Sequence, residues 1–169
     1  MSVRGSQDLL PTVSRGCYPG GMENLTRFMA YAADFEKTLV DDDWTRLRPY
    51  FAADAVYEVK SDAFACKLTG PDAIFKGMKK SLDGFDRKFD GRGIAVLEGP
   101  DVEGDTMRMR WTVTYTKAGK TPYVLPGRSE VRYRDGKIAA LIDSYDASVG
   151  LDAAAWMKAN GMIVDPSYV

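Results

Sequence analysis

The chain has 169 residues, of which 45% are hydrophobic and 28% charged, and its 23 basic and 24 acidic residues give a net charge of −1. This length builds one well-buried core, and the lack of a charge block argues against nucleic acid or a membrane surface as partner. The chain contains no histidine, which excludes Ser-His-Asp and Cys-His catalysis and histidine-bound metals.

The N-terminal segment, residues 1–21, carries Gly, Ser, Pro and Arg without apolar periodicity, and we expect an arm outside the core. Residues 22–169 are expected to form a single domain. Cys17 and Cys66 lie far apart without metal-ligand spacing, which predicts free thiols in a reducing, cytoplasmic compartment. We expect neither a membrane span nor a secretory signal, because no apolar run has the required length.

The first third of the chain predicts two helices and a strand. Apolar residues recur at helical spacing over 24–40, which begins with an asparagine suited to an N-cap. The aspartate triplet 41–43 lacks the glycine and the distal glutamate of a calcium loop, so we interpret it as the cap of a short helix over 44–51. Residues 55–60 alternate and are rich in β-branched and aromatic side chains, which predicts a strand.

A third helix is predicted over 73–85, after the Gly-Pro-Asp break, although a glycine inside it weakens the pattern. The remainder is mostly sheet, with strands expected at 87–98, 105–117, 122–134 and 137–146, followed by a helix over 153–160. Helices that precede a run of antiparallel strands indicate an α+β fold with the helices packed on one face of the sheet.

The strand over 105–117 has one apolar and one polar face. Met107, Met109, Trp111, Val113 and Tyr115 share one face, whereas Arg108, Arg110, Thr112, Thr114 and Thr116 share the other. The apolar face could meet the helices and leave the arginines in solvent. Alternatively, the sheet curls around a cavity that the polar set lines, and the apolar set meets a second subunit. The second arrangement predicts a homodimer and is our working hypothesis.

The last predicted strand, within GKIAALIDSYD, is apolar on both faces until Asp143, so both faces should be covered. A single carboxylate in such a strand is a candidate functional group. No nucleotide, phosphate or metal motif accompanies it, and we expect no cofactor.

Three segments carry a family resemblance: PYFAADAVYEV at 49–59, GPDAIFKGM at 70–78 and GKIAALIDSYD at 136–146. In this order they resemble the nuclear transport factor 2-like superfamily, which includes polyketide-cyclase-like proteins, limonene epoxide hydrolase, ketosteroid isomerase and scytalone dehydratase. The resemblance implies a cone-shaped, strongly curved mixed sheet. Three N-terminal helices would enclose a deep apolar pocket, and a C-terminal helix would follow.

The resemblance also implies site residues. Asp143, Arg110 and Tyr57 match the acid, the arginine and the water-holding tyrosine of limonene epoxide hydrolase, but Thr112 and Val59 stand where that enzyme has an aspartate and an asparagine. The epoxide hydrolase chemistry is therefore incomplete.

The other family chemistries match less well. The base of ketosteroid isomerase falls at Val59 and its helical tyrosine at Phe35, with Tyr31 one turn earlier. Scytalone dehydratase and the well-known cyclases use histidine, which this chain lacks.

We therefore predict a cofactor-free lyase, isomerase or hydrolase for a small, largely apolar or aromatic substrate. Asp143 would be the base, and Arg110 with Tyr57 would stabilise the oxyanion. Two alternatives remain open: a structural Asp143–Arg110 salt bridge in a non-catalytic binding or accessory domain, and a dimeric protein-interaction module. The residues expected to contact substrate are Tyr145, Tyr123, Trp44, Phe35, Tyr31, Thr112 and Leu141.

Overall fold

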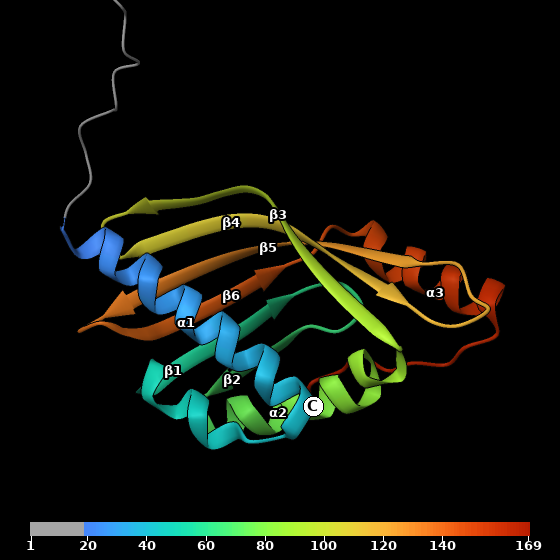
Figure 1. Ribbon diagram of the computed structural model, residues 1–169, viewed down its shortest axis with the longest axis horizontal. Helices are drawn as coiled ribbons and strands as arrows, with labels where there is room; N and C mark the ends of the chain where they lie inside the picture. The colour runs from blue at the N-terminus through green and yellow to red at the C-terminus, as the bar shows by residue number, and fades with distance from the viewer. Residues whose placement is uncertain (1–18) are drawn as a thin grey trace, which may run out of the picture.

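The computed structural model describes residues 19–169 (Figure 1). The helices are α1 (Pro19–Asp41), the 3-10 helix η1 (Trp44–Tyr50), α2 (Pro71–Gly84), the 3-10 helix η2 (Asp86–Lys88) and α3 (Ser148–Asn160). The strands are β1 (Phe51–Lys60), β2 (Cys66–Thr69), β3 (Gly91–Glu103), β4 (Thr106–Thr116), β5 (Tyr123–Arg134) and β6 (Lys137–Ser144).

The six strands form one sheet in the order β2-β1-β6-β5-β4-β3. Only β1 and β6 pair in parallel; the other neighbours are antiparallel. The sheet is curved, with α1 and α2 on its concave side and α3 at one end (Figure 1). This is the expected α+β cone with an open, mixed sheet, and the fold prediction is confirmed.

Several element boundaries differ from those expected. Helix α1 begins at Pro19, since a proline is well tolerated at a first helical position, where the backbone N–H has no helical partner. The predicted N-cap, Asn24, therefore lies inside the helix, where it is buried and donates to Asp105 at 3.3 Å. The rest of the expected arm, with Cys17, lies outside the described residues.

Two short elements follow less obvious patterns. Strand β2, which pairs with β1, was not predicted because its four residues, CKLT, give too short an alternation. The segment expected to form a strand over 87–98 begins with η2, so pairing with β4 starts only at Gly91. The aspartate triplet does cap η1, as predicted: the carboxylate of Asp43 accepts a hydrogen bond from the Thr45 amide at 3.1 Å.

The apolar face of β4 points into the molecule. Met107, Met109, Val113 and Tyr115 are buried, whereas Arg108 and Arg110 on the opposite face are exposed. The first of the two arrangements considered for this strand is therefore the observed one. It also removes the reason for expecting a homodimer, since the apolar face is covered by the chain itself.

The C-terminal tail returns from α3 to α2 (Figure 1). The Asp165 amide donates to the Gly84 carbonyl at 3.0 Å, and the Ser81 hydroxyl donates to the Pro166 carbonyl at 2.9 Å. Glycine is needed at this contact, because a Cβ at Gly84 would lie 2.2 Å from the Asp165 carbonyl oxygen. A Cβ on Gly77, the glycine inside the predicted helix, would lie 2.4 Å from Leu68 Cδ1.

No helix in residues 19–169 combines the length and the apolar composition that crossing a bilayer requires.

Candidate active site

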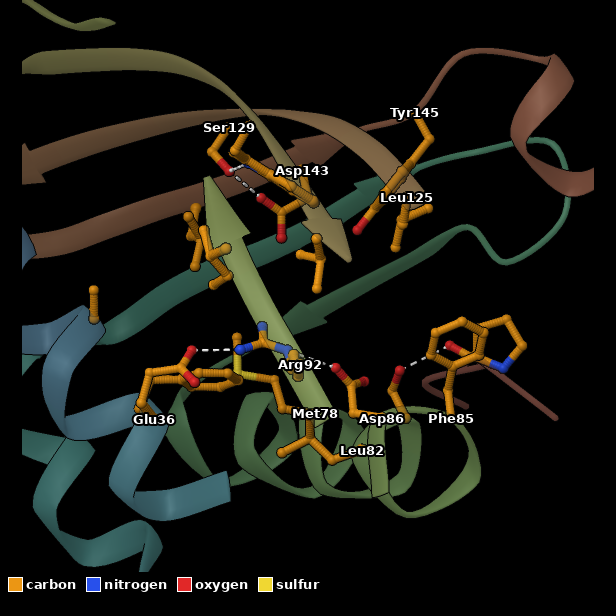
Figure 2. A pocket seen from close by; sticks show the side chains of 18 of the residues that line it. Glu36, Met78, Leu82, Phe85, Asp86, Arg92, Leu125, Ser129, Asp143 and Tyr145 are labelled. Atoms are coloured by element: carbon orange, nitrogen blue, oxygen red, sulfur yellow. Dashed lines mark hydrogen bonds and ion pairs between the residues drawn. The ribbon is translucent and has the colours of Figure 1, made fainter. Parts of the chain in front are cut away.

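A cavity of about 630 Å³ lies between the concave face of the sheet and helices α1 and α2. This size is ordinary for a small-molecule pocket. Most of its wall is apolar, with side chains such as Phe28, Leu82, Met109 and Val113. A few polar side chains interrupt this wall, and they form two groups (Figure 2).

The first polar group centres on Asp143 in β6. Register places Asp143 opposite Ser129 of β5, and the Ser129 hydroxyl donates to Asp143 Oδ1 at 2.6 Å. The hydroxyl of Tyr57, from β1, donates to Asp143 Oδ2 at 2.8 Å. Figure 2 shows the carboxylate of Asp143 directed into the cavity. The carboxylate is thus held by two neutral donors and still faces the space that a ligand would occupy.

A further shell of contacts fixes these two donors. The indole N–H of Trp111 donates to the Ser129 hydroxyl oxygen at 2.8 Å, which leaves the serine proton to point at Asp143. The hydroxyl oxygen of Tyr168, in the C-terminal tail, lies 3.2 Å from that of Tyr57. Gly127 on β5 makes room for the indole, because a Cβ there would lie 2.4 Å from the Trp111 ring.

The environment of Asp143 sets its protonation behaviour. Burial raises the pKa of this carboxyl above its ordinary value, and the hydrogen bonds from Ser129 and Tyr57 offset part of that rise. No lysine or arginine in the part of the chain that the structure describes forms an ion pair with Asp143. Burial likewise raises the pKa of the Tyr57 and Tyr145 hydroxyls, so both remain protonated donors at neutral pH.

The second polar group lies across the cavity from Asp143, around Arg92 of β3 (Figure 2). Its Nε donates to Asp86 Oδ1 at 3.0 Å, and its Nη1 donates to Glu36. The hydroxyl of Tyr115 donates to the same Asp86 oxygen at 2.9 Å. Burial raises the pKa of Asp86, although Arg92 and Tyr115 counteract part of this rise. For the Arg92 guanidinium, burial lowers the pKa, but the carboxylates of Asp86 and Glu36 outweigh this and raise it.

Most of the predicted site residues converge on this cavity. Six of them line it together with Asp143: Tyr57, Tyr145, Tyr123, Phe35, Tyr31 and Leu141. The hydroxyl of Tyr145 points into the cavity (Figure 2) and makes no hydrogen bond to any residue in 19–169. Burial raises the pKa of Tyr123 to about 12.

Three predicted site residues lie elsewhere. Arg110 points to the outer face of the sheet, where it forms a 2.6 Å ion pair with Glu98, so the expected Asp143–Arg110 pair does not form. Thr112 lies two residues after Arg110 on β4, and since side chains alternate along a strand, it shares that outer face. Trp44 packs against Phe75 outside the cavity, and its indole N–H donates to an aspartate of the capping triplet at 2.9 Å.

Other site residues were not predicted. Ser129 was not connected to Asp143, because register between strands cannot be read from alternation. Asp86 and Arg92 flank a predicted strand start and resemble ordinary surface charges, and Tyr168 lies in an irregular tail. The one signal in the sequence that could have identified Ser129 was its position among apolar residues. Within 19–169, no three acidic or cysteine side chains gather as a metal site would require.

The chain shares its fold with several solved structures. The protein TerC, co-crystallised with polyporic acid, is 18% identical, with a TM-score of 0.59 over 80% of this chain and 98% of TerC. A candidate SnoaL-like polyketide cyclase from Jannaschia sp. CCS1 is 15% identical, with a TM-score of 0.61 over 86% and 99% of the two chains. At these identities the likeness establishes the fold alone.

A third solved structure, from Catenulispora acidiphila, has a ketosteroid isomerase-like fold and holds trimethylamine; it is 18% identical, with a TM-score of 0.52 over 78% of this chain and 92% of its own. No curated protein matches the sequence. The family model for the SnoaL-like domain, however, matches residues 31–141, about two thirds of the chain. The protein therefore belongs to the SnoaL-like domain family, within the nuclear transport factor 2-like superfamily.

Proposed function

We propose that the protein is a cofactor-free enzyme that moves a proton on a small, largely apolar cyclic substrate, as lyases and isomerases do. The observation that carries this proposal is the carboxylate of Asp143, which faces an apolar cavity and, among residues 19–169, has only hydroxyl donors as partners. A carboxylate with a raised pKa is a stronger base than one in water.

The proposed step follows from the positions of the hydroxyl groups. Asp143 takes a proton from a substrate carbon next to a carbonyl, and the electron pair of the broken C–H bond moves onto the carbonyl oxygen. The Tyr145 hydroxyl, which points into the cavity, donates a hydrogen bond to that oxygen. Asp143 then returns its proton to the substrate. Arg110 has no role in this scheme.

A direct test uses ketones whose exchangeable protons report on the base. In D2O the protein should accelerate deuterium incorporation next to the carbonyl of α-tetralone, a bicyclic ketone, as followed by proton NMR. The rate without protein is the reference. Saturable binding of the ketone with no acceleration of exchange would contradict the proposal.

That contradicting result is the signature of a second candidate function, small-molecule binding without turnover. One observation favours it: both oxygens of Asp143 already accept a hydrogen bond from the protein, as in a carboxylate that only shapes a pocket. Related folds hold polyporic acid and trimethylamine, which supports a small-molecule ligand under either function.

The hydrogen bond from Tyr57 should tune the base. In Tyr57→Phe the carboxyl loses a donor that lowers its pKa, so the pKa rises and the ascending limb of exchange rate against pH moves to higher pH. At mildly acidic pH the exchange rate should fall several-fold. The matched control is Tyr50→Phe, which removes a 2.7 Å hydrogen bond to Asp34 away from the cavity and should leave the profile unchanged. Equal profiles for both variants would contradict a tuning role for Tyr57.

A further inference from the structure

Arg92 has one hydrogen-bonding direction that the protein does not use. Its Nε and Nη1 are taken by Asp86 and Glu36, but Nη2 has no hydrogen-bond partner among residues 19–169. Figure 2 shows this nitrogen pointing into the cavity, toward the wall that carries Asp143. The side chain is only 13% exposed, so the free N–H groups lie in an enclosed, mostly apolar space. A donor that the protein leaves free on a cavity wall can hydrogen-bond to an oxygen of a bound ligand.

The charge around Arg92 decides which ligand group suits it. One guanidinium faces two carboxylates, those of Asp86 and Glu36, and the cavity also contains the carboxylate of Asp143. The formal sum of these four groups is −2. An anionic ligand brought into this low-dielectric space would be repelled, whereas a neutral oxygen accepts hydrogen bonds from the free N–H groups without that penalty.

We propose that Arg92 is a specificity-determining residue of this cavity, and that the substrate is an uncharged cyclic compound with two oxygen functions. One is the carbonyl beside the reacting carbon, near Asp143 and Tyr145. The other, at the remote end, is a neutral acceptor such as a ketone or an ester that binds Arg92 Nη2. This inference deepens the proposed function, because it uses the same cavity, but it concerns binding and not proton transfer.

Three probes of similar size test which remote group the cavity prefers to bind. They are α-tetralones that carry an acetyl, an isopropyl or a carboxylate substituent at the same position of the ring far from the ketone. The wild-type protein should bind the acetyl compound about tenfold more tightly than the isopropyl compound, because a hydrogen bond from a charged donor is gained. It should bind the carboxylate at least as weakly as the isopropyl compound. Isothermal titration calorimetry measures all three affinities.

Two variants test the role of Arg92. The double variant Asp86→Asn/Arg92→Met removes the cation without leaving a buried acid unpaired, and the acetyl preference should fall to within about twofold. The matched control, Arg110→Met, changes an arginine on the outer face and should keep the full preference. Glu36→Gln, at a side chain 45% exposed, removes one negative charge and should improve carboxylate binding several-fold relative to the acetyl probe.

Three results would overturn the proposal: equal binding of the acetyl and isopropyl probes to the wild type, an unchanged acetyl preference in the double variant, or tightest binding of the carboxylate. Because calorimetry needs no turnover, the series is repeated on Asp143→Asn. In the wild type, selective binding without deuterium exchange would contradict only the proposed function. Exchange without the acetyl preference would contradict only the role of Arg92.

Discussion

Asp143→Asn is expected to lose deuterium exchange by roughly 10²–10⁴-fold, the range that a positioned general base contributes. The amide has the shape of the carboxyl group but cannot take up a proton, whereas the hydroxyls of Ser129 and Tyr57 can still hydrogen-bond to it. Proton NMR in D2O measures the rates, and ketone binding, measured separately, should change little. Retention of most of the exchange activity would show that Asp143 is not the base.

The same substitution should not destabilise the fold at neutral pH. The pKa of Asp143 is higher in the folded chain than in the unfolded chain, so the folded state holds this proton more tightly. The contribution of the group to stability is therefore greatest at acidic pH and falls as pH rises from the unfolded pKa through the folded pKa. Above that window Asp143→Asn should be at least as stable as the wild type in urea unfolding. A loss of several kcal/mol there would instead indicate a structural carboxylate.

The largest stability effect is expected for Leu47→Ala in η1. Leu47 is 0% exposed in the core cluster that also contains Tyr31, Phe51 and Ile74, and truncation leaves a cavity that these neighbours cannot fill. The free energy of unfolding should fall by about 3–4 kcal/mol. The matched control is Leu151→Ala on α3, where the side chain is 76% exposed and the change should be within ~0.5 kcal/mol. Equal losses in urea unfolding would contradict the assigned core.

The sequence could predict most elements because their patterns are local. The amphipathic stripe of α1, the capping aspartates before η1 and the alternation of β4 each follow from neighbouring residues. The short strand β2 and the tail after α3 were missed, since their positions depend on contacts with β1 and α2 that are distant in sequence.

The candidate site could be predicted only in part, for a physical reason. Alternation along β4 places Arg110 and Trp111 on opposite faces of the sheet, but it does not say which of the two faces is concave. The family resemblance favoured the wrong face for Arg110. The covered position of Asp143 could be predicted because its strand is apolar on both sides, and the structure places its carboxylate on the cavity wall. The resemblance had placed Tyr57 beside Asp143, whereas the other partner, Ser129, depends on strand register, and register is a property of the folded sheet.

The most direct test of this account is an NMR titration of the Asp143 side-chain carboxyl, assigned by comparison of the carbon-13-labelled wild type with Asp143→Asn. The account predicts a pKa above that of free aspartic acid (~3.9), which rises further in Tyr57→Phe. It also predicts that the Asp143 signal shifts when α-tetralone fills the cavity. A pKa at or below the free value, with a signal that does not respond to the ketone, would contradict it.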